Sequence, residues 1–278
     1  NDIIGALNDI SFSKYIVLED FHYLKSEVQK DFAIELKAFH ESSSLCFIIV
    51  GVWLDENKLV IYNGDLTGRI VPVNADLWKE TELRQVIQKG EAFLNVHFHP
   101  TFVNEVIEAS SGNVYIVQET CHRACKESGI ERTISGETQL IGEGLNAKDL
   151  VAKIIQEQSG RYNAFITNYA GGFQETTLAM HKWLLYPILT SSIEELSAGL
   201  TYRSIRIKIM SAHPQGNITQ ALKAVSSLQL SKSIQPIILD YDESNLTLHI
   251  VDRGFLIWLS MQDRDDLLAT VGLPESPQ

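Results

Sequence analysis

Two adjacent carboxylates, Glu19 and Asp20, are the side chains of this sequence best placed to do chemistry. They directly follow the apolar run at residues 15–18, which predicts a strand buried on both faces, as in parallel sheets covered by helices. Ligands of open α/β sheets bind at the carboxyl ends of the strands, so both acids are expected in a ligand crevice. A bound cation would explain two neighbouring carboxylates at this position, because it would neutralise their charge. The alternative is an ordinary strand end with a solvated acidic turn.

The segments on either side of these acids predict an α/β core. Residues 3–10 carry apolar side chains at helical spacing, and residues 27–40 predict a second helix with its own apolar face. The run at residues 45–51 predicts another fully apolar strand. A strand, a helix and a strand with apolar interiors imply parallel pairing through a right-handed crossover.

Composition limits the classes of function that fit. The chain has 278 residues, a net charge of -12 and three cysteines. A net charge this negative argues against a protein whose whole surface binds nucleic acid. It is compatible with one small basic surface. No apolar run approaches the about 18 residues of a membrane span, and the first residues lack a basic signal region. We therefore expect no membrane contact and a reduced, cytoplasmic location.

Beyond residue 78 the pattern becomes helical. Helices are predicted at residues 80–90, with Gly90 as the stop, at 101–111 and at 114–128. Residues 131–148 predict a linker or mobile loop. A further helix at 145–158 would end at Gly160, and Pro187 would break the apolar stretch 181–189.

The last 75 or so residues predict helices followed by a β-hairpin. Helices are expected at residues 192–196 and 201–210, at 218–228 behind the cap Asn217, and at 255–261. The hairpin spans residues 236–252 around an Asp-Glu-Ser-Asn turn. The second helix is basic through Arg203, Arg206 and Lys208, the candidate nucleic-acid contacts. The acidic turn would repel phosphate, which favours protein over DNA as the partner of the hairpin.

The order of these elements resembles that of P-loop ATPases of the AAA+ and STAND type. The strand with Glu19 and Asp20 resembles the Walker B element, the helices from residue 80 to 128 resemble the lid, and the C-terminal part resembles a winged helix. The resemblance implies ATP and Mg²⁺ as cofactors. It implies that Glu19 holds Mg²⁺, usually through water, and that Asp20 positions the attacking water.

Three further residues take roles only through this resemblance. Arg69, in a Gly-rich loop before a predicted strand at 70–73, resembles an arginine finger that acts in a neighbouring subunit. Gly112 and Asn113 resemble the Gly-Asn step at the start of a lid helix, where free N–H groups suit a nucleotide. The alternatives are a surface pair between Arg69 and Asp65, and a plain turn with a helix cap.

The sequence departs from the family pattern in two places. No polar sensor residue follows the second strand at 51–53, although Asp55, Glu56 or Asn57 could serve from the loop. No Gly-x-x-x-x-Gly-Lys-Ser/Thr loop occurs in the chain. We therefore expect this chain to be the C-terminal part of a longer ATPase, with the phosphate loop upstream of Asn1.

We therefore predict an α/β fold, a partial parallel P-loop core followed by a helical lid and a winged-helix domain. The expected boundaries are 1–77 for the core, 78–130 for the lid, 131–195 for a connector and 196–278 for the winged helix. The expected function is an ATP-dependent switch that controls assembly, as a homo-oligomer, or contacts to a protein partner. The rival is a non-catalytic winged-helix module that binds DNA or protein on a degenerate ATPase scaffold.

Metal chemistry offers a weaker third reading. Cys121 and Cys125 share a helix face, and His97 and His99 share one side of an extended segment. Neither pair has the further ligands that known zinc spacings would supply, so core cysteines and loop histidines are favoured. A metal-dependent hydrolase would need both histidines to converge with Glu19 and Asp20.

Overall fold

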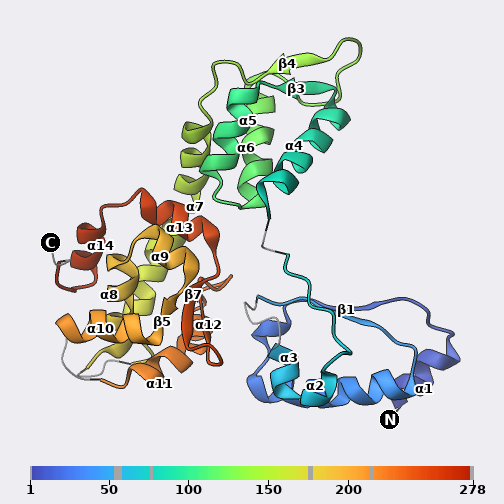
Figure 1. Ribbon diagram of the computed structural model, residues 1–278, viewed down its shortest axis with the longest axis vertical. Helices are drawn as coiled ribbons and strands as arrows, with labels where there is room; N and C mark the ends of the chain where they lie inside the picture. The colour runs from blue at the N-terminus through green and yellow to red at the C-terminus, as the bar shows by residue number, and fades with distance from the viewer. Residues whose placement is uncertain (1, 53–57, 76–77, 175–177, 213–215, 276–278) are drawn as a thin grey trace. The chain divides into compact units, whose positions relative to one another are not determined.

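The computed structural model describes residues 2–52, 58–75, 78–174, 178–212 and 216–275. The chain forms two compact units, unit 1 (Asn1–Asn74) and unit 2 (Ala75–Gln278). Both are mainly helical with small sheets (Figure 1). The expected division into four domains stays a prediction.

Unit 1 contains the parallel strand pair that the sequence predicts. Strands β1 and β2 pair in parallel, with Val17 opposite Ile48. The helix between them and the helix before them are both confirmed. The elements of unit 1 are α1 (Asp2–Asp9), β1 (Ile16–Leu18), η1 (Phe21–Tyr23), α2 (Ser26–Ser42), β2 (Phe47–Ile49), α3 (Lys58–Tyr62) and η2 (Gly64–Leu66).

Among the described residues, helix α2 covers one face of the β1–β2 sheet and the other face is exposed. Phe47 packs its ring against Phe32 and Phe39 of α2. Side chains alternate between the faces of a strand, so Val17 and Ile48 point away from α2, and they are 51% and 44% exposed. The prediction of strands buried on both faces was therefore wrong for this structure, because one helical layer covers one face only.

Two other predictions in unit 1 have different outcomes. Residues 70–73 were predicted as a strand and are not one; Val71 and Val73 are 86% and 83% exposed. Pro72, between them, has no N–H to donate to a sheet, which disfavours a central strand. The candidate sensor residues Asp55, Glu56 and Asn57 lie outside the described residues.

The first part of unit 2 is a bundle of three helices with a second parallel strand pair. It comprises α4 (Glu80–Leu94), β3 (Val96–Phe98), α5 (Pro100–Ala109), α6 (Val114–Glu127) and β4 (Gln139–Ile141). All three helices are confirmed, but α4 runs through Gly90 and ends at Asn95, whose φ of 58° is left-handed. The prediction of a linker at 131–148 was wrong for β4, which pairs with β3.

Helix α7 (Ala147–Ala170) connects this bundle to the C-terminal part of unit 2. It begins at Asn146, whose side chain accepts a hydrogen bond from the Asp149 N–H, and it runs past Gly160, where we expected it to end. Ala147 and Leu150 belong to the core of the bundle, and the residues from Val151 onward belong to the C-terminal core. A helix shared by two cores is stabilised along its whole length, which outweighs one helical glycine.

The C-terminal part packs helices against a three-stranded antiparallel sheet of order β5-β7-β6. The predicted hairpin is confirmed as β6 and β7. Pro187 lies inside α8 and does not break it. The elements are α8 (Met180–Thr190), α9 (Ile193–Ala198), β5 (Leu200–Thr201), α10 (Tyr202–Ala212), α11 (Ile218–Lys223), α12 (Val225–Ser231), β6 (Leu239–Asp242), β7 (Thr247–Ile250), α13 (Arg253–Ser260) and α14 (Arg264–Thr270).

Hydropathy along the helices bears on membrane insertion. Among the helices that the structure describes, none combines the length and the apolar character needed to cross a bilayer.

Candidate functional site

Glu19 and Asp20 lie at the carboxyl edge of the parallel pair. The Phe21 N–H donates to the carbonyl of Val50, just beyond β2, with N and O 3.0 Å apart. This bond fastens the acidic turn to the ends of both strands. Asp20 has a left-handed backbone (φ 55°, ψ 26°), which costs about 1 kcal/mol for a residue other than glycine. Both acids are exposed to solvent, as the alternative of a solvated acidic turn expects.

The donor set at this edge suits a hard cation. Mg²⁺ is usually held by one or two carboxylates, with water and substrate phosphates as the other ligands. Two carboxylates on one turn fit that pattern. Among the described residues there is no group of three or more His, Cys, Asp or Glu that would form an all-protein metal site.

Arg69 lies at the C-terminal end of α2. Its Nη2 is 3.1 Å from the Glu41 Oε1, in the last turn of that helix. The alternative pair with Asp65 was wrong, because Asp65 pairs with Lys37 at 2.7 Å. Phe21, which follows Asp20, packs its ring against Phe32, and Phe32 lies about 13 Å along the helix axis from Glu41. Within one chain the structure does not bring Arg69 to Glu19 and Asp20.

Gly112 and Asn113 form a turn and a helix cap. The Asn113 Oδ1 accepts a hydrogen bond from the Ile116 N–H at 3.2 Å, at the start of α6. Gly112 has a φ of +79°, which favours glycine. The plain-turn alternative describes this geometry fully. These two residues lie in unit 2 and the acids lie in unit 1.

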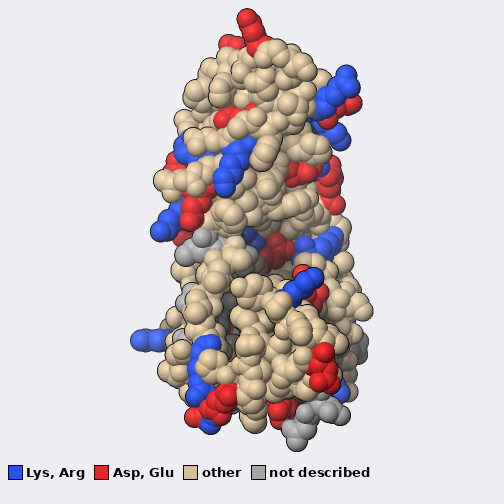
Figure 2. Space-filling model, turned by 90° about the vertical axis from the view of Figure 1, so that its right-hand side faces the viewer, with Lys and Arg blue, Asp and Glu red and all other residues tan. Residues whose placement is uncertain are grey.

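The three basic candidates on α10 have different surroundings. The Lys208 Nζ donates to the Ser191 Oγ at 2.7 Å and to the Glu195 Oε2 at 3.1 Å, so its charge is used within the fold. Arg203 and Arg206 are exposed. On the face shown in Figure 2, basic and acidic side chains are interspersed, and the described residues of that face form no continuous basic stripe. This leaves Arg203 and Arg206 as a small basic surface.

The cysteines follow the favoured alternative of core packing, whereas the expectation of loop histidines was wrong, because His97 lies within β3 and His99 is the cap of α5. Cys125 is buried in the bundle core and Cys121 packs against that core. Burial raises the pKa of Cys121 to about 12, so its thiol stays protonated. His99 caps α5 through Nδ1, and the Nδ1 of His97 lies 3.7 Å from a Glu91 carboxylate oxygen. Both histidines lie in unit 2, whereas Glu19 and Asp20 lie in unit 1.

Three ion pairs, made by Arg69 and Arg123, were not predicted from the sequence. Glu41 holds Arg69, although 28 positions separate them in the chain. Arg123 links α6 to α7. Its Nη1 and Nη2 donate to the two carboxylate oxygens of Glu157 on α7, at 2.8 Å and 2.7 Å. Its Nε donates to the Glu119 Oε1 on α6, at 2.9 Å. Of these pairs, only Glu119 and Arg123 have a sequence signal, the i, i+4 spacing on one helix.

Comparison with known proteins gives a limited result. No protein-family model and no curated protein matches the sequence. Three solved structures of RuvB variants from Thermotoga maritima are similar over 90% of this chain and 72 to 73% of theirs. Sequence identity is 12 to 13%, and the TM-scores are 0.33 to 0.36. At these values the likeness carries no argument about fold or function.

Proposed function

We propose that this chain is part of a nucleotide-dependent switch of the AAA+/STAND type that binds ATP with Mg²⁺ and hydrolyses it slowly. The observation that carries the proposal is the position of Glu19 and Asp20 at the carboxyl edge of a parallel strand pair. Ligands of such sheets bind at that edge. The left-handed backbone of Asp20 is local strain of the kind that collects at functional sites.

The two acids would divide the work. Glu19 would hold Mg²⁺, which neutralises phosphate charge when bound. Asp20 would accept a hydrogen bond from the attacking water and orient it. Its side chain is one methylene shorter than that of glutamate, so it reaches less far into the site. Slow hydrolysis is therefore the expected behaviour of this arrangement.

The proposal requires a phosphate-binding loop from outside these 278 residues. Val17 and Ile48 expose apolar side chains on the face of the β1–β2 sheet that α2 does not cover. Parallel sheets are normally covered on both faces, so this exposure favours a further structural layer in the complete protein. An additional α/β layer would bury this face. The same layer could bring the phosphate loop to the carboxyl edge where the acids lie.

Arg69 would complete the site of a neighbouring subunit. Its ion pair with Glu41 holds it at the C-terminal end of α2, and the described residues record no contact between Arg69 and either acid, which fits a role in trans within a homo-oligomer. A permanently charged guanidinium there would neutralise phosphate charge. Glu41 would hold Arg69 in the free subunit.

The rest of the chain would transmit the nucleotide state. We assign α4 to α6 to the lid and the β5-β7-β6 sheet with its helices to a winged helix. Gly112 and Asn113 would place the start of α6 near the nucleotide. Binding energy at the phosphates would then favour one of two arrangements of lid and core, as in other two-state switches.

A second candidate is a non-catalytic binding module. The β5-β7-β6 sheet favours it, since a hairpin beside short helices is how a wing is built. The turn between β6 and β7 is acidic, and its Glu243 pairs with Lys223. This favours a protein partner over DNA, with Arg203 and Arg206 as the remaining contacts for phosphate.

Substitution of Asp20 in the complete protein tests the proposal. Asp20→Asn should leave ATP binding intact and lower turnover by at least about 100-fold, the scale of a lost orienting group. Asp31→Asn, at an exposed acid on α2, is the matched control and should leave turnover unchanged. Equal turnover of Asp20→Asn and the unaltered protein would remove Asp20 from the mechanism. No ATP binding by the complete protein would favour the second candidate.

A further inference from the structure

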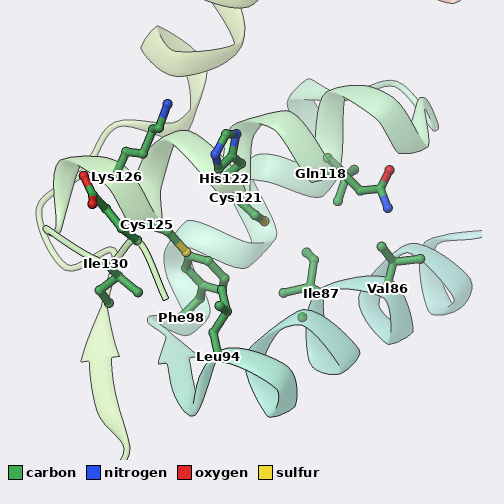
Figure 3. Close-up of a pocket in the computed structure, with 13 residues that line it drawn as sticks. Val86, Ile87, Leu94, Phe98, Gln118, Cys121, His122, Cys125, Lys126 and Ile130 are labelled. Atoms are coloured by element: carbon green, nitrogen blue, oxygen red, sulfur yellow. The ribbon is translucent and has the colours of Figure 1, made fainter. Parts of the chain in front are cut away.

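A cavity of about 410 Å³ lies in unit 2 between α4 and α6. Its wall is mostly apolar, and Phe98 of β3 lies at one end. In Figure 3 the sulfur atoms of Cys121 and Cys125 point from α6 toward Ile87 and Leu94 of α4. Its volume falls within the range of about 300 to 1,000 Å³ that small-molecule sites occupy.

Gly90 leaves part of this cavity open. It lies inside α4 and lines the cavity, and a Cβ added there would meet nothing within 4 Å. A glycine inside a helix costs about 0.5 to 1 kcal/mol relative to alanine. No contact described within this chain requires that glycine.

The side of the cavity formed by α6 has two rows of side chains. Val117, Cys121 and Cys125 are spaced by four residues and form the deep row. Burial raises the pKa of Cys121, so this row is neutral and apolar.

Gln118, His122 and Lys126 repeat the same spacing one position later and form the rim of the cavity. Each can donate a hydrogen bond, and the Nδ1 of His122 lies 3.5 Å from the Glu119 Oε2, which leaves its Nε2 for a ligand. Glu131 is the acid in the lining, and Lys126 has no recorded ion pair among the described residues.

We propose that this cavity binds a small amphipathic molecule with an apolar body and an anionic head group. The body would lie between α4 and α6 above Gly90. The head group would accept hydrogen bonds from His122 and Lys126 at the rim. A small molecule fits better than a protein surface, because the apolar wall lies inside a cavity below a polar rim. This site goes beyond the proposed ATPase function and involves none of its residues.

Titration of the 278-residue chain with decanoate tests this assignment. Isothermal titration calorimetry should show saturable binding at one site. Gly90→Leu puts a side chain into the cavity and suits a helix, so binding should weaken at least about tenfold. Gly90→Ala, which adds one methyl group, should weaken it less. Gly160→Ala is the control, since Gly160 is also helical and open but lies outside the cavity, and its binding should match that of the unaltered chain.

The head group is tested separately. Lys126→Gln should weaken decanoate at least about threefold and leave the neutral decanol unchanged, because one charge-assisted hydrogen bond is lost. Circular dichroism should show that every variant keeps its helices. The proposed site would be wrong if Gly90→Leu bound decanoate as tightly as the unaltered chain does. It would also be wrong if neither decanoate nor decanol showed saturable binding. Equal binding of decanoate by Lys126→Gln would overturn the anionic head group.

Discussion

The two units use similar apolar sequences to build cores of different completeness. In unit 1 the buried apolar core is Phe21, Ala33, Leu59 and Leu66. In unit 2 a continuous core joins α7, α8, α13 and the β5-β7-β6 sheet, with Trp258, Tyr162 and Phe165 fully buried. Both units contain apolar strands and helices. They differ in how much of their apolar surface is buried against other elements. A unit that leaves apolar faces uncovered buries less apolar surface and gains less stability from it.

This difference bears on function. The unit with the smaller core carries the acids and Arg69, and the unit with the larger core carries the proposed lid and winged helix. A sheet that lacks a layer on one face has less packing to resist local opening. The stability of unit 1 is therefore expected to depend on what covers that face, whereas unit 2 stabilises itself.

The largest expected effect is on the core of unit 2. Phe165 is fully buried and packs against Phe255 and Tyr169. Phe165→Ala should lower the free energy of unfolding of unit 2 by about 3 to 5 kcal/mol, because it leaves a cavity. Hydrogen exchange with mass spectrometry should show faster exchange in α7 and α13 and unchanged exchange in α2. Faster exchange in both units alike would contradict their independence.

The uncovered sheet face gives the second prediction. Val17→Lys should change the stability of the 278-residue chain by no more than about 0.5 kcal/mol, since Val17 is exposed there. In the complete protein the same change should cost about 3 kcal/mol, because an unpaired charge would be buried. Chemical denaturation of both lengths measures this contrast. Ser13→Lys, just before the strand, is the control and should be tolerated in both lengths. If Val17→Lys is tolerated equally well in the 278-residue chain and in the complete protein, no additional layer covers this face.

The smallest effect concerns the ionic brace between α6 and α7. The hydrogen bond from Arg123, only partly opposed by desolvation, lowers the pKa of Glu119. A lowered pKa in the folded state adds stability above the unfolded pKa of about 4.3, and this stability is lost as pH falls through the folded value. Glu119→Gln should therefore cost about 1 kcal/mol at pH about 7 and almost nothing at pH about 3.

Urea unfolding of unit 2 at the two pH values checks this dependence. Glu137→Gln, at an exposed acid outside the helices, is the control and should show no such difference. A cost for Glu119→Gln that persists unchanged at the lower pH would mean that packing of the side chain, and not its charge, holds the brace.

Much of the element order was predictable from the sequence, and the ends of elements were not. Apolar periodicity predicted α2, α5, α6 and the hairpin, because each is long enough to show its period. Gly90, Gly160 and Pro187 were taken as stops, yet each lies within a helix that packing sustains. Strand β4 has three residues, too few for a period, and it exists because β3 lies beside it.

The candidate site was predictable in its residue types and not in its partners. Adjacent acids after an apolar run are a local signal, and the structure places them at the edge of the parallel pair. The pairing of Arg69 with Glu41 depends on how the loop after η2 meets the end of α2. The cavity over Gly90 depends on the separation of α4 and α6. Such contacts between distant segments leave no mark in a single sequence.

The central claim is that the acids of one chain and Arg69 of another form one nucleotide site. It is tested by mixing two inactive variants of the complete protein, Asp20→Asn and Arg69→Ala, and measuring steady-state ATP hydrolysis. Each alone should be slowed at least about 100-fold. A mixed interface can combine the intact Asp20 of one chain with the intact Arg69 of the other, so the mixture should recover activity above either variant. Mixed oligomers seen by native mass spectrometry with no recovered activity would contradict the claim.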